Sequence, residues 1–126
     1  MDRTTSVHVE RYNNAGKRDT TGNVSKDGLA SQWRHVDLVI DKAASTLYID
    51  GEQAATVAPA DGASFAQLTD ILGADGGVLQ IGKANWVNGE YYTGALDNRN
   101  IYGSAHTAEQ IKEAYDSTKA DAAKAD

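Results

Sequence analysis

A short loop rich in aromatic and amide side chains contains the residue types best suited to holding a ligand. It reads Lys83-Ala-Asn-Trp-Val-Asn-Gly89, and two tyrosines follow it closely. An exposed aromatic ring can stack on the apolar C–H face of a sugar, while amide side chains hydrogen-bond its hydroxyl groups. The candidate contact surface consists of Asn85, Trp86, Asn88, Tyr91 and Tyr92. The alternative is that Trp86 folds back as a plug over a sheet, and the sequence leaves both interpretations open.

Composition excludes several other kinds of chemistry. The chain has 126 residues, a net charge of −6 and no cysteine. An acidic chain is poorly suited to bind nucleic acid or anionic membranes, because both select basic surfaces. The absence of cysteine rules out disulfides, thiolate metal sites and cysteine nucleophiles, and it leaves the cellular compartment open. No apolar run approaches the length that a membrane-spanning helix needs, so we expect no membrane insertion.

Short apolar runs between glycine-rich turns predict an all-β architecture around the candidate loop. The clearest part is a meander of three strands at Trp33–Ile40, Thr46–Asp50 and Gln53–Ala58. Val36, Leu38 and Ile40 share one face of the first strand, since side chains alternate along a strand. Asp50-Gly51 closes the second hairpin as a type I′ turn.

The chain before the meander shows weaker signals. Residues Val7 to Tyr12 alternate in polarity, which predicts a half-buried strand with Val7, Val9 and Tyr12 turned inward. Residues Asn13 to Leu29 are polar and predict a long loop with one weak strand near Val24.

Three further elements follow Pro59, which ends the meander. Ser64–Leu72 is either a short helix or an irregular insertion that places Phe65 and Leu68 on the core, and Val78–Gly82 is another strand. Tyr91–Tyr102 reads as a long strand bent at Gly94.

The last element is a helix from Thr107 to about Lys119. Thr107 and Gln110 form a capping box, and Glu109 lies in the first turn, where the helix dipole favours an anion. Ile111 and Tyr115 fall on one stripe and dock the helix. Residues 121–126 contain no bulky anchor, so we expect a frayed tail after a single domain over residues 1–120.

Several segments, in this order, resemble the laminin G-like (concanavalin A-like lectin/glucanase) domains of bacterial surface and secreted proteins. They are Gln32–Asp41, Ser45–Glu52, Leu79–Gly82, Tyr92–Tyr102 and Thr107–Ile111. The resemblance implies an antiparallel β-sandwich of the concanavalin A-like jelly-roll type, here with one C-terminal α-helix. Only residues 1–32 precede Trp33, whereas the family has several strands there, so the chain is either a C-terminal portion of a domain or a sandwich with shortened sheets. At Asp97–Tyr102, Arg99 replaces a usual apolar residue and Asn100 a usual arginine.

The resemblance also suggests roles for individual residues. Trp33 would pack inside the sandwich with His35 beside it, both in structural roles. Calcium is common in such domains, and the loop containing Asp70 and Asp75 offers carboxylates that suit a hard cation. However, the spacing matches no EF-hand, and aspartate before glycine is also ordinary turn chemistry.

We expect no enzymatic activity. Glycosidases that resemble this family have a Glu-x-Asp-x-x-Glu strand, which supplies a nucleophile and an acid/base, and the sequence has no such motif. It also lacks the common metalloprotease, esterase and phosphate-loop motifs. The resemblance therefore favours a non-catalytic carbohydrate-binding or accessory module, extracellular or on a bacterial cell surface and attached to a glycoside hydrolase. The alternative is a packing domain without ligand, which braces a neighbouring domain or self-associates through sheet edges.

Overall fold

The structure is a computed structural model that describes residues 6–7, 10–12, 18–20, 24–25, 32–41, 43–58 and 91–125. The described residues fall in two compact units. The first unit comprises Met1–Ala66 and Ala105–Asp126 and contains every labelled strand and the helix; the second comprises Gln67–Ser104. The predicted elements Ser64–Leu72 and Val78–Gly82 lie outside the described residues.

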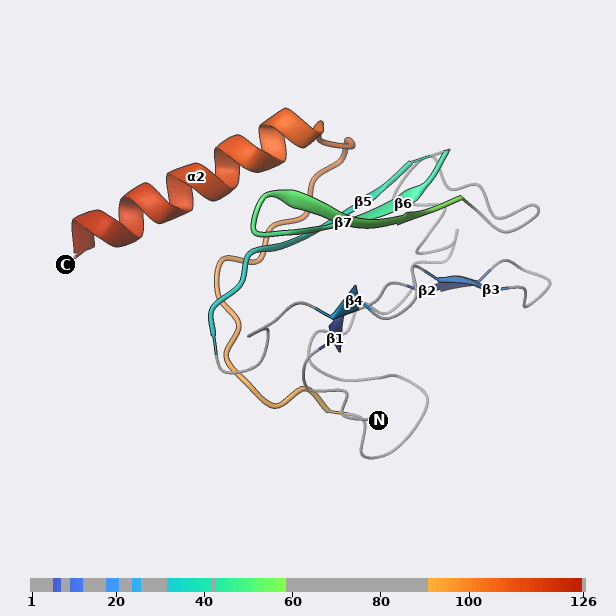
Figure 1. Cartoon of the computed structure of the whole chain (residues 1–126), viewed down its shortest axis with the longest axis horizontal. Helices are drawn as coiled ribbons and strands as arrows, with labels where there is room; N and C mark the ends of the chain where they lie inside the picture. Colours follow the sequence, from blue (N-terminus) through green and yellow to red (C-terminus); the bar gives the residue numbers. More distant parts are fainter. Residues whose placement is uncertain are drawn as a thin grey trace. The chain divides into compact units, whose positions relative to one another are not determined.

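A three-stranded antiparallel sheet is the main element of the first unit (Figure 1). Its strands are β5 (Val36–Ile40), β6 (Ser45–Ile49) and β7 (Glu52–Val57), in the order β5-β6-β7. This confirms the predicted meander. At the first hairpin, the Asp41 carboxylate accepts hydrogen bonds from the backbone N–H groups of Ala43 and Ala44, at 2.7 and 2.9 Å, which fixes the turn.

Register places one set of apolar side chains, drawn from all three strands, on the same face of the sheet, while Tyr48 and Val39 lie on the other face. Val36 pairs with Ile49 and Leu38 with Leu47, and directly paired residues point to the same side. Ala55 and Val57 of β7 join this face opposite Leu47 and Ser45. Leu47 and Ile49 are buried because they belong to the central strand, whereas Val36 and Leu38 on β5 remain exposed. The predicted shared face of β5 is therefore confirmed, and among the described strands β5 pairs with β6 alone.

The second hairpin has the turn that the sequence predicts. Asp50 and Gly51 both have positive φ angles, of 55° and 78°, as a type I′ turn requires. The pairing then shifts by one residue between Leu47 and Tyr48, because Leu47 pairs with Ala55 and Tyr48 with Gln53. Ala54 is the extra residue of this β-bulge, which increases the local twist of the strands.

Two short ladders lie in the N-terminal part of the first unit. Strand β1 (Ser6–Val7) pairs with β4 (Val24–Ser25), and β2 (Glu10–Tyr12) pairs with β3 (Arg18–Thr20), both antiparallel. The registers of the two ladders differ by one residue. The predicted strand at Val7–Tyr12 is present at Val7 and over Glu10–Tyr12, whereas residues 8–9 lie outside the described residues. The weak strand near Val24 is also present, and strand β3 was not predicted because Arg18-Asp-Thr20 has no apolar residue.

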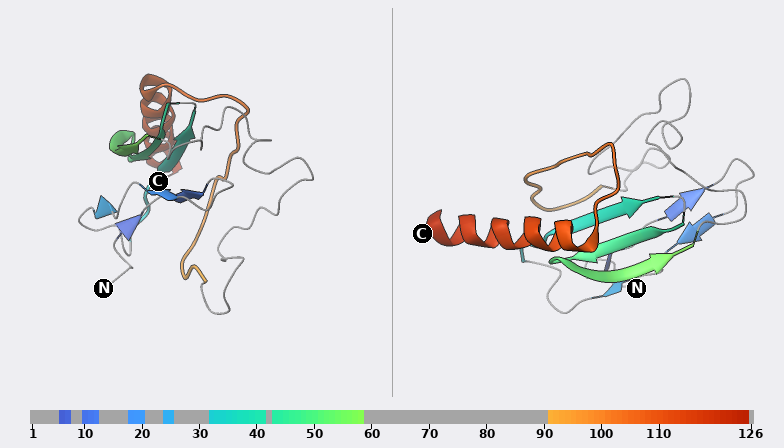
Figure 2. Two further views of the ribbon diagram at one scale, coloured as in Figure 1. Left: turned by 90° about the vertical axis from the view of Figure 1, so that its right-hand side faces the viewer. Right: turned by 90° about the horizontal axis from the view of Figure 1, so that it is seen from above.

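Helix α2 (Ala108–Ala125) lies beside the β6–β7 turn (Figure 2). Its capping box is present: the Thr107 N–H donates to Gln110 Oε1 at 2.9 Å, and the Gln110 N–H donates to Thr107 Oγ1 at 3.2 Å. Ile111 is buried, and Tyr115 contacts the Asp50-Gly51 turn, as the apolar stripe predicted.

The helix ends six residues beyond the predicted end at Lys119. Four alanines among the last six described residues explain the difference, because alanine favours the helix without any packing partner. The predicted domain limit at residue 120 and the frayed tail over 121–126 stay predictions.

The predicted strand at Tyr91–Tyr102 is wrong beyond its first residue. Tyr91 makes an isolated bridge, the chain bends at Gly94, and residues 95–104 have no ladder. Side chains compete with the ladder here: Asp97 Oδ1 accepts from the Asn98 N–H at 2.8 Å, and Asn100 Nδ2 donates to the Asn98 carbonyl at 3.2 Å. Asn98 also has a positive φ of 49°, which a strand does not allow.

Candidate functional site

Two residues of the predicted contact surface are described, and both are open to solvent. Tyr91 is 61% exposed and Tyr92 is 56% exposed. The other members, Asn85, Trp86 and Asn88, lie outside the described residues, as do Asp70 and Asp75 of the predicted calcium loop. The structure therefore brings together one part of the predicted surface, a pair of adjacent tyrosines in the second unit.

A hydrogen bond across Gly94 holds the ring of Tyr92 in place. The Tyr92 hydroxyl donates to the Ala95 carbonyl at 3.4 Å, so the ring bends back over the turn at Gly94. A Cβ atom at position 94 would lie 2.6 Å from the Tyr92 hydroxyl oxygen. Only glycine leaves room for this close approach. The ring is thus held by its polar end while more than half of the side chain stays available for contact.

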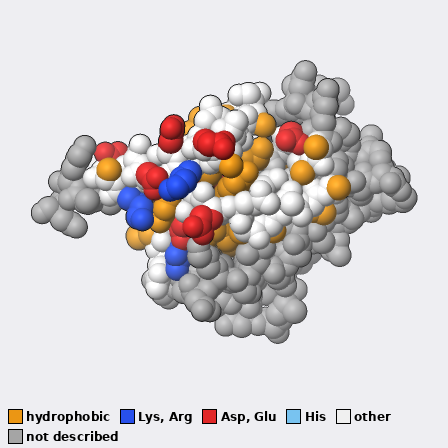
Figure 3. Space-filling view, turned by 45° about the horizontal axis from the view of Figure 1, so that its top comes forward, with side chains coloured by type: hydrophobic (Ala, Val, Ile, Leu, Met, Phe, Trp, Pro, Cys, Tyr) orange, Lys and Arg blue, Asp and Glu red, His pale blue; other side chains and the backbone are white. Residues whose placement is uncertain are grey.

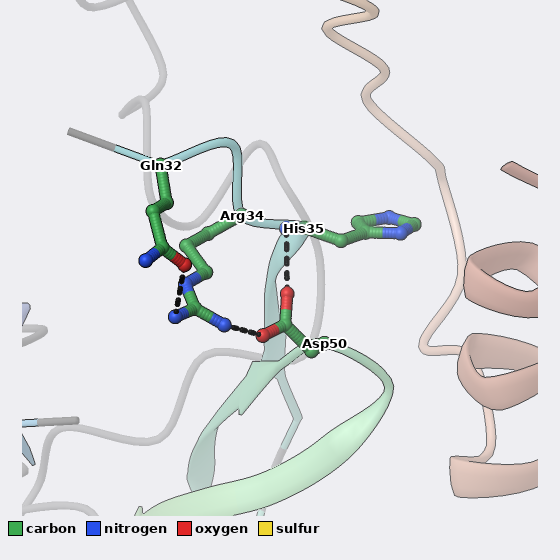
Figure 4. A network of polar contacts seen from close by, with 4 residues as sticks. All are labelled: Gln32, Arg34, His35 and Asp50. Atoms are coloured by element: carbon green, nitrogen blue, oxygen red, sulfur yellow. Dashed lines mark hydrogen bonds and ion pairs between the residues drawn. The ribbon is translucent and has the colours of Figure 1, made fainter. Parts of the chain in front are cut away.

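A second feature lies in the first unit, where polar groups fix the chain around Trp33 (Figure 4). Arg34 Nη1 lies 2.6 Å from Asp50 Oδ2, and the His35 N–H donates to Asp50 Oδ1 at 3.1 Å. The Asp50 N–H in turn donates to the His35 carbonyl at 2.8 Å. Arg34 Nη2 also donates to Gln32 Oε1 at 3.0 Å. We call Gln32, Arg34, His35 and Asp50 the turn clamp.

Trp33 lies within this clamped segment and is exposed. Its side chain is 70% exposed, so the prediction that it packs inside a sandwich is wrong. The two residues that flank Trp33 are held by polar contacts, because Arg34 donates to Gln32 and is paired with Asp50. The clamp fixes the backbone at position 33 independently of what the indole contacts.

His35 packs against helix α2, and the predicted position beside a buried Trp33 is wrong. Its ring points toward α2 in Figure 4 and lies against the Tyr115 ring, with centroids 5.8 Å apart and planes tilted by 58°. Its Nε2 is 3.4 Å from the carboxylate of Asp37 on the same strand face. Lys119 Nζ lies 5.0 Å from the Tyr115 ring centroid, as a cation–π contact. His35 thus connects β5 to the docked helix.

The sequence predicts Asp50 as a turn residue and does not predict the clamp. Its carboxylate is largely buried and paired, which makes it a part of the scaffold. One feature of the sequence could have indicated the clamp. Arg34 lies near the start of a strand that is expected to pair with the strand ending in Asp50-Gly51, so the two side chains can meet at the end of the sheet.

The described surface carries charges of both signs. Acidic and basic side chains are interspersed on the described part of the face in Figure 3, without a broad basic area. Within the described ranges, no cluster of three or more metal-ligating side chains occurs. No helix there is long and apolar enough to cross a bilayer.

Comparison with known families gives a match over most of the chain. Residues 2–112 match the sequence profile of a laminin G-like family described as the concanavalin A-like lectin/glucanases superfamily. A search of curated proteins finds no significant match.

A solved structure shares the fold. The chain is similar to a crystal structure of an S-layer domain-containing protein (residues 221–444) from Clostridium thermocellum, with a TM-score of 0.54 and 18% sequence identity. The similarity covers 91% of this chain and 65% of that one, so the chain spans about two thirds of the neighbour's length. At this identity the likeness concerns the fold alone.

Proposed function

The chain belongs to the concanavalin A-like lectin/glucanases superfamily, and on that premise we propose that it is a non-catalytic carbohydrate-binding module. In this proposal it acts within a secreted or cell-surface bacterial protein and holds an attached catalytic domain, such as a glycoside hydrolase, near its polysaccharide. The observation that carries the proposal is the exposed pair Tyr91 and Tyr92, one of which is held against a glycine turn. Together with Trp86, Asn85 and Asn88 they would form the binding surface.

The proposed architecture is a two-layered sandwich. One face of the described sheet is apolar on all three strands, and such a face requires a covering layer. A second antiparallel sheet would supply that layer, as the family suggests. The surface location is supported by the fold shared with a domain of an S-layer domain-containing protein.

The absence of catalysis is part of the proposal. Sandwich glycosidases need two carboxylates that face each other across an open site. The sequence has no Glu-x-Asp-x-x-Glu strand, and the most buried carboxylate near the hairpin, that of Asp50, is engaged by Arg34 and the His35 N–H. We therefore expect binding without hydrolysis.

Substitution of the exposed tyrosines tests the binding surface. We expect Tyr92→Ala to weaken binding to a soluble polysaccharide by about threefold to tenfold, because it removes one stacking ring. Tyr91→Ala should have a similar effect. Affinity electrophoresis against a panel of neutral polysaccharides, followed by calorimetry on the polymer that retards the protein, measures this.

Tyr102→Ala is the matched control, since Tyr102 is 58% exposed in the same unit but is not a member of the predicted surface. It should bind like the unmodified protein. If all three variants bind the polysaccharide as tightly as the unmodified chain, Tyr91 and Tyr92 do not belong to the binding surface.

Self-association without ligand is a second candidate, favoured by the exposed apolar side chains of Val36 and Leu38 on β5. Among the described strands, β5 pairs only with β6, so its outer edge offers backbone groups to another copy. This candidate predicts an average mass that rises with concentration in sedimentation equilibrium and falls to the monomer in Leu38→Lys. Thr56→Lys, at an exposed position of β7, is the control. A monomer at every concentration would refute the candidate.

A further inference from the structure

We infer that Trp33 is a second stacking platform for a neutral pyranose ring, separate from the tyrosine surface of the other unit. This inference rests on the proposed function for the class of ligand, but it depends on different residues. Trp33 is the most exposed of the large hydrophobic side chains in the described residues, at 70%. Tryptophan offers the largest ring area for stacking, and an indole has few rotatable bonds to order when a ligand binds.

The surroundings of Trp33 are organised before any ligand arrives. Two links tie the chain directly after Trp33 to the β6–β7 turn: Arg34 contacts Asp50 at 2.6 Å, and the His35 N–H donates to the same carboxylate at 3.1 Å. Gln32 is tied to Arg34 at 3.0 Å. A site that is already ordered avoids much of the entropic cost of binding. Because these contacts hold the backbone and not the indole, the exposed ring is not needed for the clamp itself.

A hydrogen-bonding group lies next to the ring in sequence. Gln32 uses its Oε1 to accept from Arg34, and within the described part of the chain no partner is found for its Nε2 group. Its side chain is exposed, so this amide can donate to a sugar hydroxyl. An apolar ring flanked by an amide donor matches a pyranose, which has C–H groups on its faces and hydroxyls at its rim.

Charge selects a neutral sugar over an acidic one. Arg34, the next residue in the sequence, carries a guanidinium group that is paired with the Asp50 carboxylate. The chain as a whole carries a net charge of −6, which disfavours approach of a polyanion. Uronate-rich or sulfated polymers are therefore expected to bind more weakly than neutral ones.

The test uses the full chain and the neutral polysaccharide that retards it in affinity electrophoresis. Trp33→Ala should weaken binding about threefold to tenfold, and Trp33→Phe should retain most of the affinity because a ring remains. Circular dichroism of each variant establishes that it is folded. A direct readout comes from Trp86→Phe, in which Trp33 is the remaining tryptophan. In that variant, the polysaccharide should protect Trp33 fluorescence from acrylamide quenching.

Each outcome separates this inference from the proposal on the tyrosine surface. If the unmodified chain binds and Trp33→Ala binds equally well, the Trp33 platform is refuted while the tyrosine surface stands. If Trp33→Ala weakens binding and the tyrosine variants do not, Trp33 is supported and the tyrosine surface is refuted. The inference is overturned if the bound polysaccharide does not protect Trp33 from acrylamide quenching. It is also overturned if Trp33→Ala changes the sedimentation of the protein but leaves its affinity for the polysaccharide unchanged.

Discussion

Gly51→Ala is expected to lower the free energy of unfolding by about 2–3 kcal/mol. Two costs add at this position. Gly51 has a φ of 78°, where residues with a Cβ are strained, and an added Cβ would lie 2.9 Å from Tyr115 Cδ1. The clash forces Tyr115 away, so the substitution also weakens the docking of α2. Urea denaturation followed by circular dichroism measures the change.

Gly103→Ala is the matched control for this substitution. An added Cβ at Gly103 meets nothing within 4 Å, and its φ is not in the left-handed region. We expect a change within about 0.5 kcal/mol, as for most surface substitutions. Equal stabilities for the two variants would show that neither the turn geometry nor the Tyr115 contact is as described.

The second large effect is expected for Asp50→Ala, which should cost about 3 kcal/mol of stability. The substitution leaves the Arg34 guanidinium without the carboxylate at 2.6 Å and removes the acceptor of the His35 N–H. It also places alanine at a φ of 55°, a conformation in which aspartate and asparagine are better tolerated. Chemical denaturation of the purified variant gives the value.

Asp50→Asn separates these causes. Asparagine tolerates the positive φ and retains an acceptor for the His35 N–H but loses the charge, so we expect a cost of about 1–2 kcal/mol. Asp116→Asn is the control, because Asp116 pairs with Lys112 at 3.0 Å on an exposed helix face, where ion pairs contribute little. If Asp50→Ala were no more harmful than Asp116→Asn, the clamp would have no structural role.

Features determined by neighbouring residues were predictable from the sequence. The Asp50-Gly51 turn follows from residue types that tolerate positive φ, and the capping box follows from Thr107 and Gln110 three residues apart. The face shared by Val36 and Leu38 follows from the period of a strand. In each case the decisive contacts join residues that are close in sequence or in register.

Features determined by contacts between distant segments were not predictable in this way. Whether Trp33 is buried depends on which other part of the chain covers it. The alternation of side chains along a strand predicts which face a residue lies on, but it does not predict what covers that face. Asp50 acts on Arg34 and His35 across the sheet, at a distance of fifteen to sixteen residues in sequence. The strand expected at Tyr91–Tyr102 ends after its first residue for a different reason, since Asp97 and Asn100 hydrogen-bond to the local backbone and take the place of a ladder.

The central claim, that this domain holds a polysaccharide without cleaving it, is tested most directly by one chromatographic measurement. The protein is incubated with the neutral polysaccharide that retards it, and light scattering after size-exclusion chromatography reports complex formation and polymer mass together. We predict that protein elutes with the polymer and that the mass of the polymer stays constant during incubation. A polymer that becomes shorter with time, or protein that never elutes with any polymer of the panel, would contradict the claim.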